Sequence, residues 1–182
     1  MAADEVKGVL VAYKTVMEAS WPNLHPAMKA RAALWPAASE PSLQSELREY
    51  VREASLPTCR VRVFWKIGPQ FPFTGCNTHF ATDAGFANVA DLIGLNDFHE
   101  KMPWAAQAAK FRKDDKEVFD SGVAKLDILE RQDSAAGTVW VLVGKAPIRN
   151  GSGVVIGILG MYELLEEAVA TKMYLERTRR QA

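Results

Sequence analysis

The stretch VFWKIGPQFPFTGCNTHF, residues 63–80, decides the fold. Apolar residues recur at every second position from residue 61 to residue 67, and this period of two predicts a β-strand. The next three residues, GPQ, have the composition of a turn. The segment FPFTG, residues 71–75, then predicts a short second strand.

The residues before this stretch predict helices. Val6, Leu10, Tyr13 and Met17 recur at steps of three and four, which places them on one face of a helix. A short second helix is predicted around residues 27–34. A third has the apolar stripe Leu43, Leu47, Tyr50, Val51 and Ala54 and ends before Pro57.

The residues after this stretch predict short helices and then more strands. Residues 77–121 predict a run of short helices broken at Gly85, Gly94 and Pro103. Three strands follow, joined by QDSAAG and RNGSG, which have hairpin composition; their predicted ranges are 123–130, 138–148 and 154–162. Two strands, a helical insertion and a three-stranded meander, with helices at both ends, describe one α+β domain.

Composition narrows the function classes. The chain has 182 residues with 22 Lys and Arg against 22 Asp and Glu, so no net field attracts nucleic acid or an anionic membrane. We therefore expect neither partner. Two cysteines make no disulfide framework, and no segment has the form of a signal peptide or a membrane span, so a cytoplasmic location is expected.

Three segments carry a resemblance to a known family: VFWKIGPQFPFTGCNTHFATDAGF (63–86), LIGLNDFHEKMPWAAQAAKFRKDDKEVFDSG (92–122) and ILERQDSAAGTVWVLVGKAPIRNGSGVVIGILGMYEL (128–164). In their order and gaps they resemble the PAS sensory domain, in a subgroup found in bacterial signal-transduction proteins. The resemblance implies the PAS fold, with a five-stranded antiparallel sheet and a helical insertion between strands 2 and 3.

The resemblance also divides the chain. Residues 1–58 are expected to form a helical N-terminal extension, residues 59–162 the PAS domain, and residues 163–182 a C-terminal signalling or linker helix. Two positions depart from the family pattern: Ile67 replaces an acidic residue, and Glu163-Leu164-Leu165 replaces the usual DIT that couples the core to the output helix.

Cys76 and His79 are three residues apart and could form a metal site or a nucleophile pair. A metal site needs three or four ligands and a nucleophilic Cys needs a base with an orienting group, and neither set is completed nearby. The structural alternative is a buried Cys76, Asn77 as the cap of the following helix, Phe80 in the core and His79 at the surface. No catalytic set and no metal site are predicted.

The resemblance also bears on cofactors. Flavin photosensors of this fold carry a reactive Cys where this chain has Asp97, so covalent flavin chemistry is not expected. Haem-binding relatives take an axial His from the long helix, here residues 105–121, which contains no His. His99 is the one candidate ligand if haem binds, and the cofactor stays unknown.

Candidate ligand-binding residues follow from the family's pocket between helices and sheet. They are Trp65, Asn77, Phe80, Asp97, Phe98, Trp104, Phe111, Glu130 and Trp140. For Asp97, Trp104, Asp114 and Asp115 the alternative is a structural role in capping and core packing.

Two further patterns leave alternatives open. Strand parity places Leu126, Ile128 and Glu130 on one face, so Glu130 either pairs with a cation such as Lys145 or escapes to water at the strand end. The six residues Met161, Leu164, Ala168, Thr171, Leu175 and Thr178 have the spacing of a short coiled-coil seam. The other interpretation is a helix folded back on the domain.

The leading hypothesis is a sensory module that binds a small ligand and signals through its C-terminal helix to a homodimer partner or an output domain of the kinase or cyclic-nucleotide type. The module itself is not expected to be an enzyme. One alternative is a small enzyme that uses Asp97, His99, Asp115 or Glu130. The other is a ligand-free dimerisation module with a core packed solid by Trp65, Phe80, Phe111 and Trp140.

Overall fold

A five-stranded antiparallel sheet in the order β2-β1-β5-β4-β3 organises the computed structural model, which describes residues 1–182. The strands are β1 (Val61–Ile67), β2 (Phe73–Cys76), β3 (Lys125–Ser134), β4 (Gly137–Arg149) and β5 (Val155–Leu165). The predicted α+β class and the five antiparallel strands are confirmed. The fold is the PAS fold, with the helical insertion between β2 and β3.

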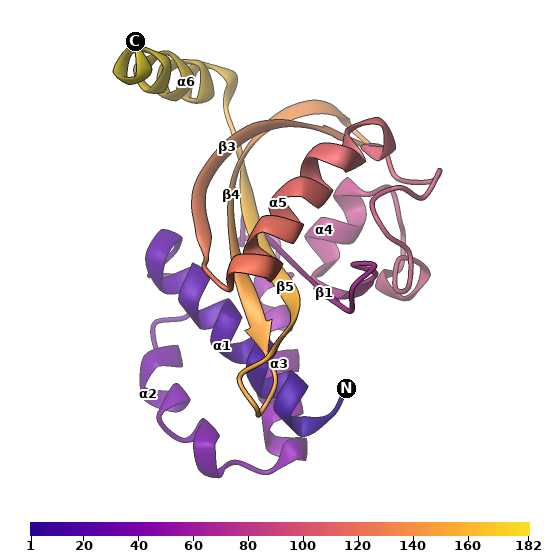
Figure 1. The fold of residues 1–182 in the computed structure, drawn as a ribbon, viewed down its shortest axis with the longest axis vertical. Helices are drawn as coiled ribbons and strands as arrows, with labels where there is room; N and C mark the ends of the chain where they lie inside the picture. Colours follow the sequence, from indigo (N-terminus) through magenta and orange to yellow (C-terminus); the bar gives the residue numbers. More distant parts are fainter.

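Helices cover both faces of the sheet (Figure 1). The N-terminal helices are α1 (Ala3–Ser20), α2 (Met28–Ala32), η1 (Trp35–Ala37) and α3 (Glu40–Ala54). The insertion contains α4 (Thr78–Asp83), η2 (Val89–Asp91), η3 (Ala105–Gln107) and α5 (Ala108–Ser121). We call the face toward α1 and α3 the outer face, and the face toward α4 and α5 the inner face.

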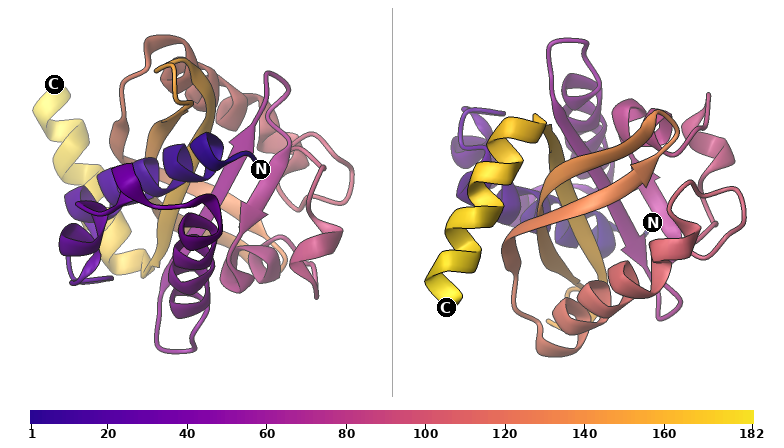
Figure 2. Two further views of the ribbon diagram at one scale, coloured as in Figure 1. Left: turned by 90° about the horizontal axis from the view of Figure 1, so that it is seen from below. Right: turned by 90° about the horizontal axis from the view of Figure 1, so that it is seen from above.

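The outer face is an apolar layer that joins the N-terminal helices to the sheet. The residues predicted to form one stripe of α1 are all buried there, together with Val63 and Trp65 of β1. Figure 2 shows α1 crossing the sheet. The two backbones come so close that a Cβ on Gly8 would lie 2.1 Å from the carbonyl oxygen of Arg149, so only glycine fits at this crossing.

The inner face holds a second core, built mainly from aromatic residues. Phe64, Phe73, Phe80 and Trp104 are buried there, and the Phe64 and Phe80 ring centroids lie 4.7 Å apart. α5 ends at Gly122, which adopts φ +65° and carries the chain from the helix into β3. Two cores therefore lie on opposite faces of one sheet.

A β-bulge at the start of β3 corrects the predicted strand parity. Asp127 has φ +56°, and the pairing with β4 shifts between Lys125 and Ile128. Leu126 lies over Gly144 and is 37% exposed, whereas Ile128 packs against the inner core. The prediction that Leu126 shares a face with Ile128 is wrong, because the extra residue of the bulge reverses the alternation.

The C-terminal helix α6 (Glu167–Gln181) begins later than the predicted range of 163–182, because β5 continues to Leu165. Met161 and Leu164 therefore lie in a strand, and the predicted seam reduces to the exposed residues Ala168, Thr171, Leu175 and Thr178. The view from above shows α6 beside the sheet (Figure 2). Its attachment is thin, since Ala170 is its one buried residue.

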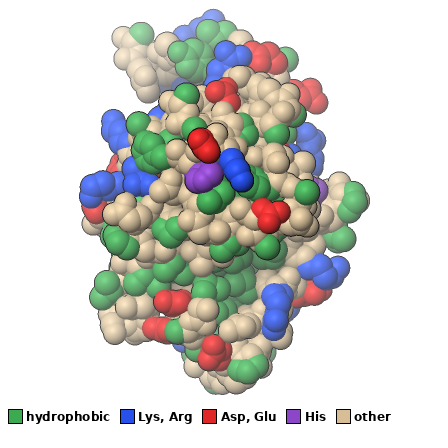
Figure 3. Space-filling view, turned by 90° about the vertical axis from the view of Figure 1, so that its right-hand side faces the viewer, with side chains coloured by type: hydrophobic (Ala, Val, Ile, Leu, Met, Phe, Trp, Pro, Cys, Tyr) green, Lys and Arg blue, Asp and Glu red, His purple; other side chains and the backbone are tan.

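The surface mixes charges of both signs. Figure 3, which faces the right-hand side of Figure 1, shows Lys, Arg, Asp and Glu side chains around a hydrophobic area across the middle of this face. None of the helices combines the length and the hydrophobicity that a bilayer crossing requires.

Candidate ligand cavity on the inner face

A small cavity lies between the inner face of the sheet and the helical insertion. Its volume is about 20 Å³, which is close to the space of a single water molecule. Its lining residues are Phe64, Lys66, Phe73, Phe80, Asp97, Trp104, Phe111, Glu130, Gln132, Val143, Lys145 and Tyr162. Five of the twelve are Phe or Trp, so the walls are flat and aromatic while the polar groups come from the sheet and one loop.

A buried charge cluster forms the polar part of the cavity. Lys66 Nζ lies 2.5 Å from Asp97 Oδ2 and 2.5 Å from Asp115 Oδ2, and Lys145 Nζ lies 2.6 Å from Asp115 Oδ1. The Trp104 indole N–H donates to Asp97 Oδ1 over 3.0 Å. Two cations face two anions, so the cluster is neutral and each carboxylate oxygen has a donor.

Four separate elements supply the cluster. Lys66 comes from β1, Lys145 from β4 and Asp115 from the buried side of α5, while Asp97 follows η2 in a loop. All four residues are at most 3% exposed. The cluster thereby ties the helical insertion to the sheet.

Ion pairing determines the charge states in the cluster. Burial alone would lower the pKa of Lys66, but the carboxylates of Asp115 and Asp97 outweigh it and the pKa lies above its ordinary value. Burial would likewise raise the pKa of Asp115, but Lys145 and Lys66 outweigh it and the pKa is lowered. Both groups stay charged at neutral pH, and the energetic cost of burying them is offset only while all partners are present.

Glu130 lies on the inner face near this cluster. Its carboxylate pairs with Lys110 Nζ of α5 at 3.3 Å, while the Glu130 side chain is 9% exposed and that of Lys110 is 46% exposed. Burial raises the pKa of Glu130, against the opposing effect of Lys145 and Lys110. Of the two alternatives for this residue, the structure has the paired one, with Lys110 as the direct partner.

A chain of hydrogen bonds leads from the cavity toward the surface through β5. The Tyr162 hydroxyl donates to Asp83 over 2.8 Å, and Gln132 Nε2 donates to the Tyr162 oxygen over 3.3 Å. Arg62 holds Asp83 with two nitrogens, at 2.8 and 3.2 Å. β5 is thereby linked to β3, α4 and β1 at the level of the cavity.

The GCN motif at residues 75–77 has a structural role. Burial raises the pKa of the Cys76 thiol to about 12, which leaves it protonated at neutral pH. The Asn77 side chain accepts from the N–H groups of Val63 and Phe80 and donates to two carbonyls, so it caps α4 and pins it to β1. His79 contacts the Leu56 carbonyl at 2.9 Å.

The predicted ligand residues divide into two groups. Phe80, Asp97, Trp104, Phe111 and Glu130 line the inner cavity; Trp65, Asn77, Phe98 and Trp140 do not. Trp65 and Trp140 belong to the outer face, because β1 and β4 turn their other set of side chains inward. Phe98 is 51% exposed. Asn77 is buried, and its side chain is hydrogen-bonded to the backbone.

Sequence reasoning missed several lining residues, above all Lys66, Lys145 and Tyr162. The alternation of β1 predicted a strand but gave Lys66 no role, and both faces of β1 are covered. A lysine on the strand, followed by two acidic family positions at Asp97 and Asp115, was the available signal. Of the groups considered for acid–base work, Asp97 and Asp115 are in ion pairs with Lys66, and Glu130 is in an ion pair with Lys110.

His99 and Asp114 lie outside the inner cavity. His99 Nδ1 accepts from the N–H of Lys101 over 3.2 Å. Asp114 pairs with Lys125 Nζ at 2.7 Å and fastens α5 to the start of β3.

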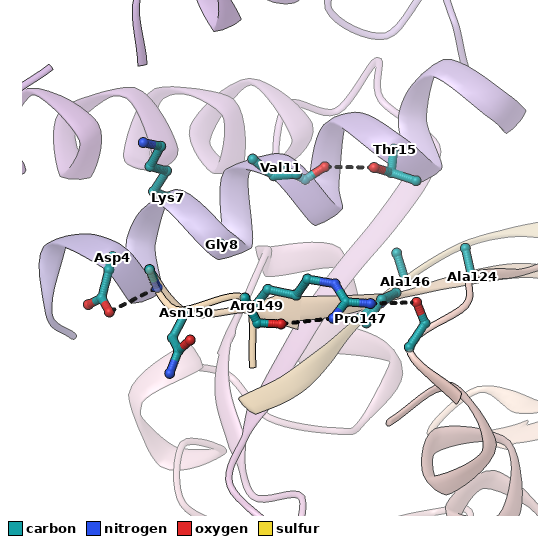
Figure 4. A pocket seen from close by; sticks show the side chains of 13 residues that line it. Asp4, Lys7, Gly8, Val11, Thr15, Ala124, Ala146, Pro147, Arg149 and Asn150 are labelled. Atoms are coloured by element: carbon teal, nitrogen blue, oxygen red, sulfur yellow. Dashed lines mark hydrogen bonds between the residues drawn. The ribbon is translucent and has the colours of Figure 1, made fainter. Parts of the chain in front are cut away.

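Another hollow, of about 540 Å³, lies between α1 and the β4–β5 hairpin (Figure 4). Arg149 crosses it and donates to the carbonyls of Gly153 and Gly122, each over 2.9 Å. Asp4 accepts from the N–H of Gly151 over 3.2 Å. Asp4 thereby joins α1 to the hairpin and Arg149 joins the hairpin to the end of α5, so we do not regard the cleft as the ligand site.

Comparison with solved structures places the fold among receptor and photoreceptor domains. A structure of VqmA bound to DPO is 25% identical over 56% of this chain and 52% of its own, with a TM-score of 0.51. The Vibrio cholerae VqmA–ligand–DNA complex is 24% identical over 65% of this chain and 51% of its own, with a TM-score of 0.54. A light-oxygen-voltage domain studied with a flavin analogue is 19% identical over 78% and 99%, with a TM-score of 0.54.

No protein-family model matches the chain, and no curated protein does. The chain spans about half the length of the VqmA structures that it matches. The likeness to these structures shows the PAS fold, which light-oxygen-voltage domains share.

One prediction about partners is wrong. Balanced charge led us to expect no nucleic-acid partner, yet the matched structures include a receptor in complex with DNA. The argument failed because a balanced net charge does not exclude a nucleic-acid partner. Net charge over 182 residues is a property of these residues alone.

Proposed function

We propose that this PAS domain is a sensory module that takes a small, flat, polar ligand into the inner cavity and passes the change through β5 to α6. The single observation that carries the proposal is the buried cluster of Lys66, Asp97, Asp115 and Lys145 within aromatic walls. Aromatic faces bind a flat ring, and charged groups at one end fix its orientation.

Ligand entry requires the walls to separate, because a cavity of about 20 Å³ holds no organic molecule. The Lys110–Glu130 pair lies at the edge of the cavity where α5 meets β3, and Lys110 is the exposed partner. Opening there breaks this ion pair and the hydrogen bond of 3.1 Å from Lys110 Nζ to the Arg131 carbonyl, two contacts that both depend on Lys110. Inside the cavity, the donor groups of a ligand would replace lysines at the aspartates. Its acceptor groups would replace aspartates at the lysines.

The route to α6 is short. Tyr162 lines the cavity, β5 ends three residues later at Leu165, and α6 begins at Glu167. α6 is held by a hydrogen bond of 2.6 Å from Arg177 to the Asp127 carbonyl and by the Tyr174 ring, whose centroid is 6.0 Å from that of Trp140. A helix with so few contacts shifts at small cost in free energy. In a longer receptor the output region that α6 addresses can be one that binds nucleic acid, as in the VqmA–DNA complex.

The indole N–H of Trp104 reports directly on this cavity, since it donates to Asp97. We expect its ¹⁵N-NMR resonance to shift when fragment-sized polar heterocycles, with uracil and nicotinamide among them, are screened against the purified protein. Phe111→Trp, which fills the cavity, is expected to weaken binding of any hit at least tenfold. Phe98→Trp is the matched control, because Phe98 is exposed and outside the cavity.

The relay is tested by hydrogen exchange with the same hit. Amides of α6 are expected to change their exchange rates on binding, while those of α3, on the other side of the sheet, do not. A Trp104 resonance that no compound moves, together with no co-purifying small molecule in native mass spectrometry, would contradict ligand sensing. The nearly filled cavity favours the second candidate function in that case, a module that associates without a ligand.

A further inference from the structure

A second hollow lies on the outer face and is separated from the inner cavity by β1. Its volume is about 260 Å³, and it lies between the start of α1, α3 and β1. The lining residues are Met1, Val6, Gln44, Leu47, Arg48, Val51 and Trp65. Five of the seven are apolar, and a hydrophobic area crosses the face that carries the N-terminal end of the chain (Figures 1 and 3).

Trp65 lines this hollow and has an unsatisfied polar group. The residue is 6% exposed, and its indole N–H is buried without an acceptor. A buried donor without a partner costs free energy that a suitable ligand atom would recover. The ring cannot retreat toward β2, because it already occupies the space in which a Cβ on Gly75 would stand, 2.0 Å from Cζ2.

Arg48 contributes an uncompensated charge. Its side chain is exposed and has no ion pair and no hydrogen bond, whereas Arg52 on the same helix pairs with Glu49 at 2.6 Å and Arg31 pairs with Glu46 at 3.0 Å. No Asp or Glu lines the hollow. An apolar floor with a free guanidinium at its rim matches a ligand with an apolar body and one anionic end.

We propose that this outer hollow is a binding site for a small monocarboxylate with an apolar chain, of the size of a medium-chain fatty acid. The chain lies on Val6, Leu47 and Val51, and the carboxylate pairs with Arg48. Trp65 lines the same hollow, so its indole resonance reports on a ligand bound there. This site is independent of the inner cavity and does not rest on the function proposed for it.

The two sites have separate reporters, so one titration tests the proposal. Octanoate is added to the ¹⁵N-labelled full chain, and the indole resonances are assigned with Trp65→Phe and Trp104→Phe. The Trp65 resonance is expected to move with octanoate and to stay in place with octylamine, whose charge is reversed. The Trp104 resonance, on the inner face, is expected to stay in place in both titrations.

Variants separate carboxylate recognition from unspecific apolar binding. Arg48→Gln is expected to weaken octanoate binding about fivefold, as for loss of one exposed charge pair. Arg52→Gln, which removes the same charge four residues along α3, should leave the affinity unchanged. No movement of the Trp65 resonance, movement of Trp104 instead, or equal affinity in Arg48→Gln and the parent chain would each overturn the proposal.

Discussion

Both faces of the sheet are covered by helices, but different interactions hold the helices on each face. On the outer face, α1 and α3 bury aliphatic and aromatic side chains, and α1 comes close enough to β4 to require Gly8. On the inner face, α5 is fastened through the buried charges of Lys66, Asp115 and Lys145. Apolar packing is stable under many conditions, whereas a buried charge cluster is stable only when complete.

This difference suggests different roles for the two faces of the sheet. The outer face holds the N-terminal helices through an apolar layer of buried residues. In the proposed function the inner face has two states, since a ligand that replaces one partner of the cluster changes the balance of all the others. The proposal thus needs both properties, a fixed layer and a layer that can be switched.

Asp115→Asn tests the inner face and has the largest expected effect. The substitution keeps the shape but leaves Lys145 and part of Lys66 without a buried counter-charge, so we expect a loss of about 3–5 kcal/mol in the free energy of unfolding. Urea denaturation at pH 7 measures it. Asp120→Asn is the control: Asp120 pairs with Lys116 on the same helix but is 56% exposed, and its loss should cost less than about 0.5 kcal/mol. Equal losses in the two variants would contradict the claim that the buried cluster contributes more to stability than an exposed ion pair.

Leu10→Ala tests the outer face and should cost about 3 kcal/mol, because it leaves a hole in a packed apolar layer. Leu10 is fully buried, whereas its neighbour Val11 is 49% exposed, so Val11→Ala should change stability by less than about 0.5 kcal/mol. The loss for Leu10→Ala is expected to be the same at 0.05 and 0.5 M salt in thermal or urea unfolding. A loss that depends on salt would contradict the apolar account of this face.

Local patterns were sufficient to predict most of the fold. The stripe on α1, the stripe on α3 and the alternation of β1 each depend on neighbours in sequence, and the structure has the two helices and the strand that they predict. The bulge at Asp127 was missed, because one residue with positive φ leaves no periodic signal. This single extra residue moves the Leu126 side chain to the other face of the sheet.

The charge cluster was predictable only in part. Asp97 and Trp104 were identified by resemblance, but Lys66 pairs with Asp97 and Asp115 across 31 and 49 residues of sequence. Such pairs form because the fold brings β1, the loop and α5 together, and no local rule encodes them. The prediction placed Trp65 at the cavity, although the opposite face of β1, with Phe64 and Lys66, lines it; burial on both faces removes the contrast that would distinguish them.

The smallest expected effect concerns a polar contact within the outer layer. His25 accepts from or donates to the Tyr13 hydroxyl at 3.0 Å and contacts Glu53 at 2.8 Å, and the ring of Tyr50 and the charge of Arg31 also face it. Burial lowers the pKa of His25, although Glu53 opposes this effect. The folded chain therefore resists protonation at a pH where the unfolded chain already binds a proton, below about 6.5.

The unfolded state thus gains protons first as the pH falls from 7 to 5, and stability is lost in that window. His25→Gln removes this contribution. Between pH 7 and 5 the parent chain should therefore lose more free energy of unfolding than the variant does, by up to about 1 kcal/mol. Urea titrations at both pH values measure the difference, with His79→Gln as the control because His79 contacts only a backbone carbonyl. If His25→Gln and the parent chain lose the same free energy of unfolding between pH 7 and 5, Glu53 fully compensates the burial of His25. The outer face then has no pH-sensitive contact at this residue.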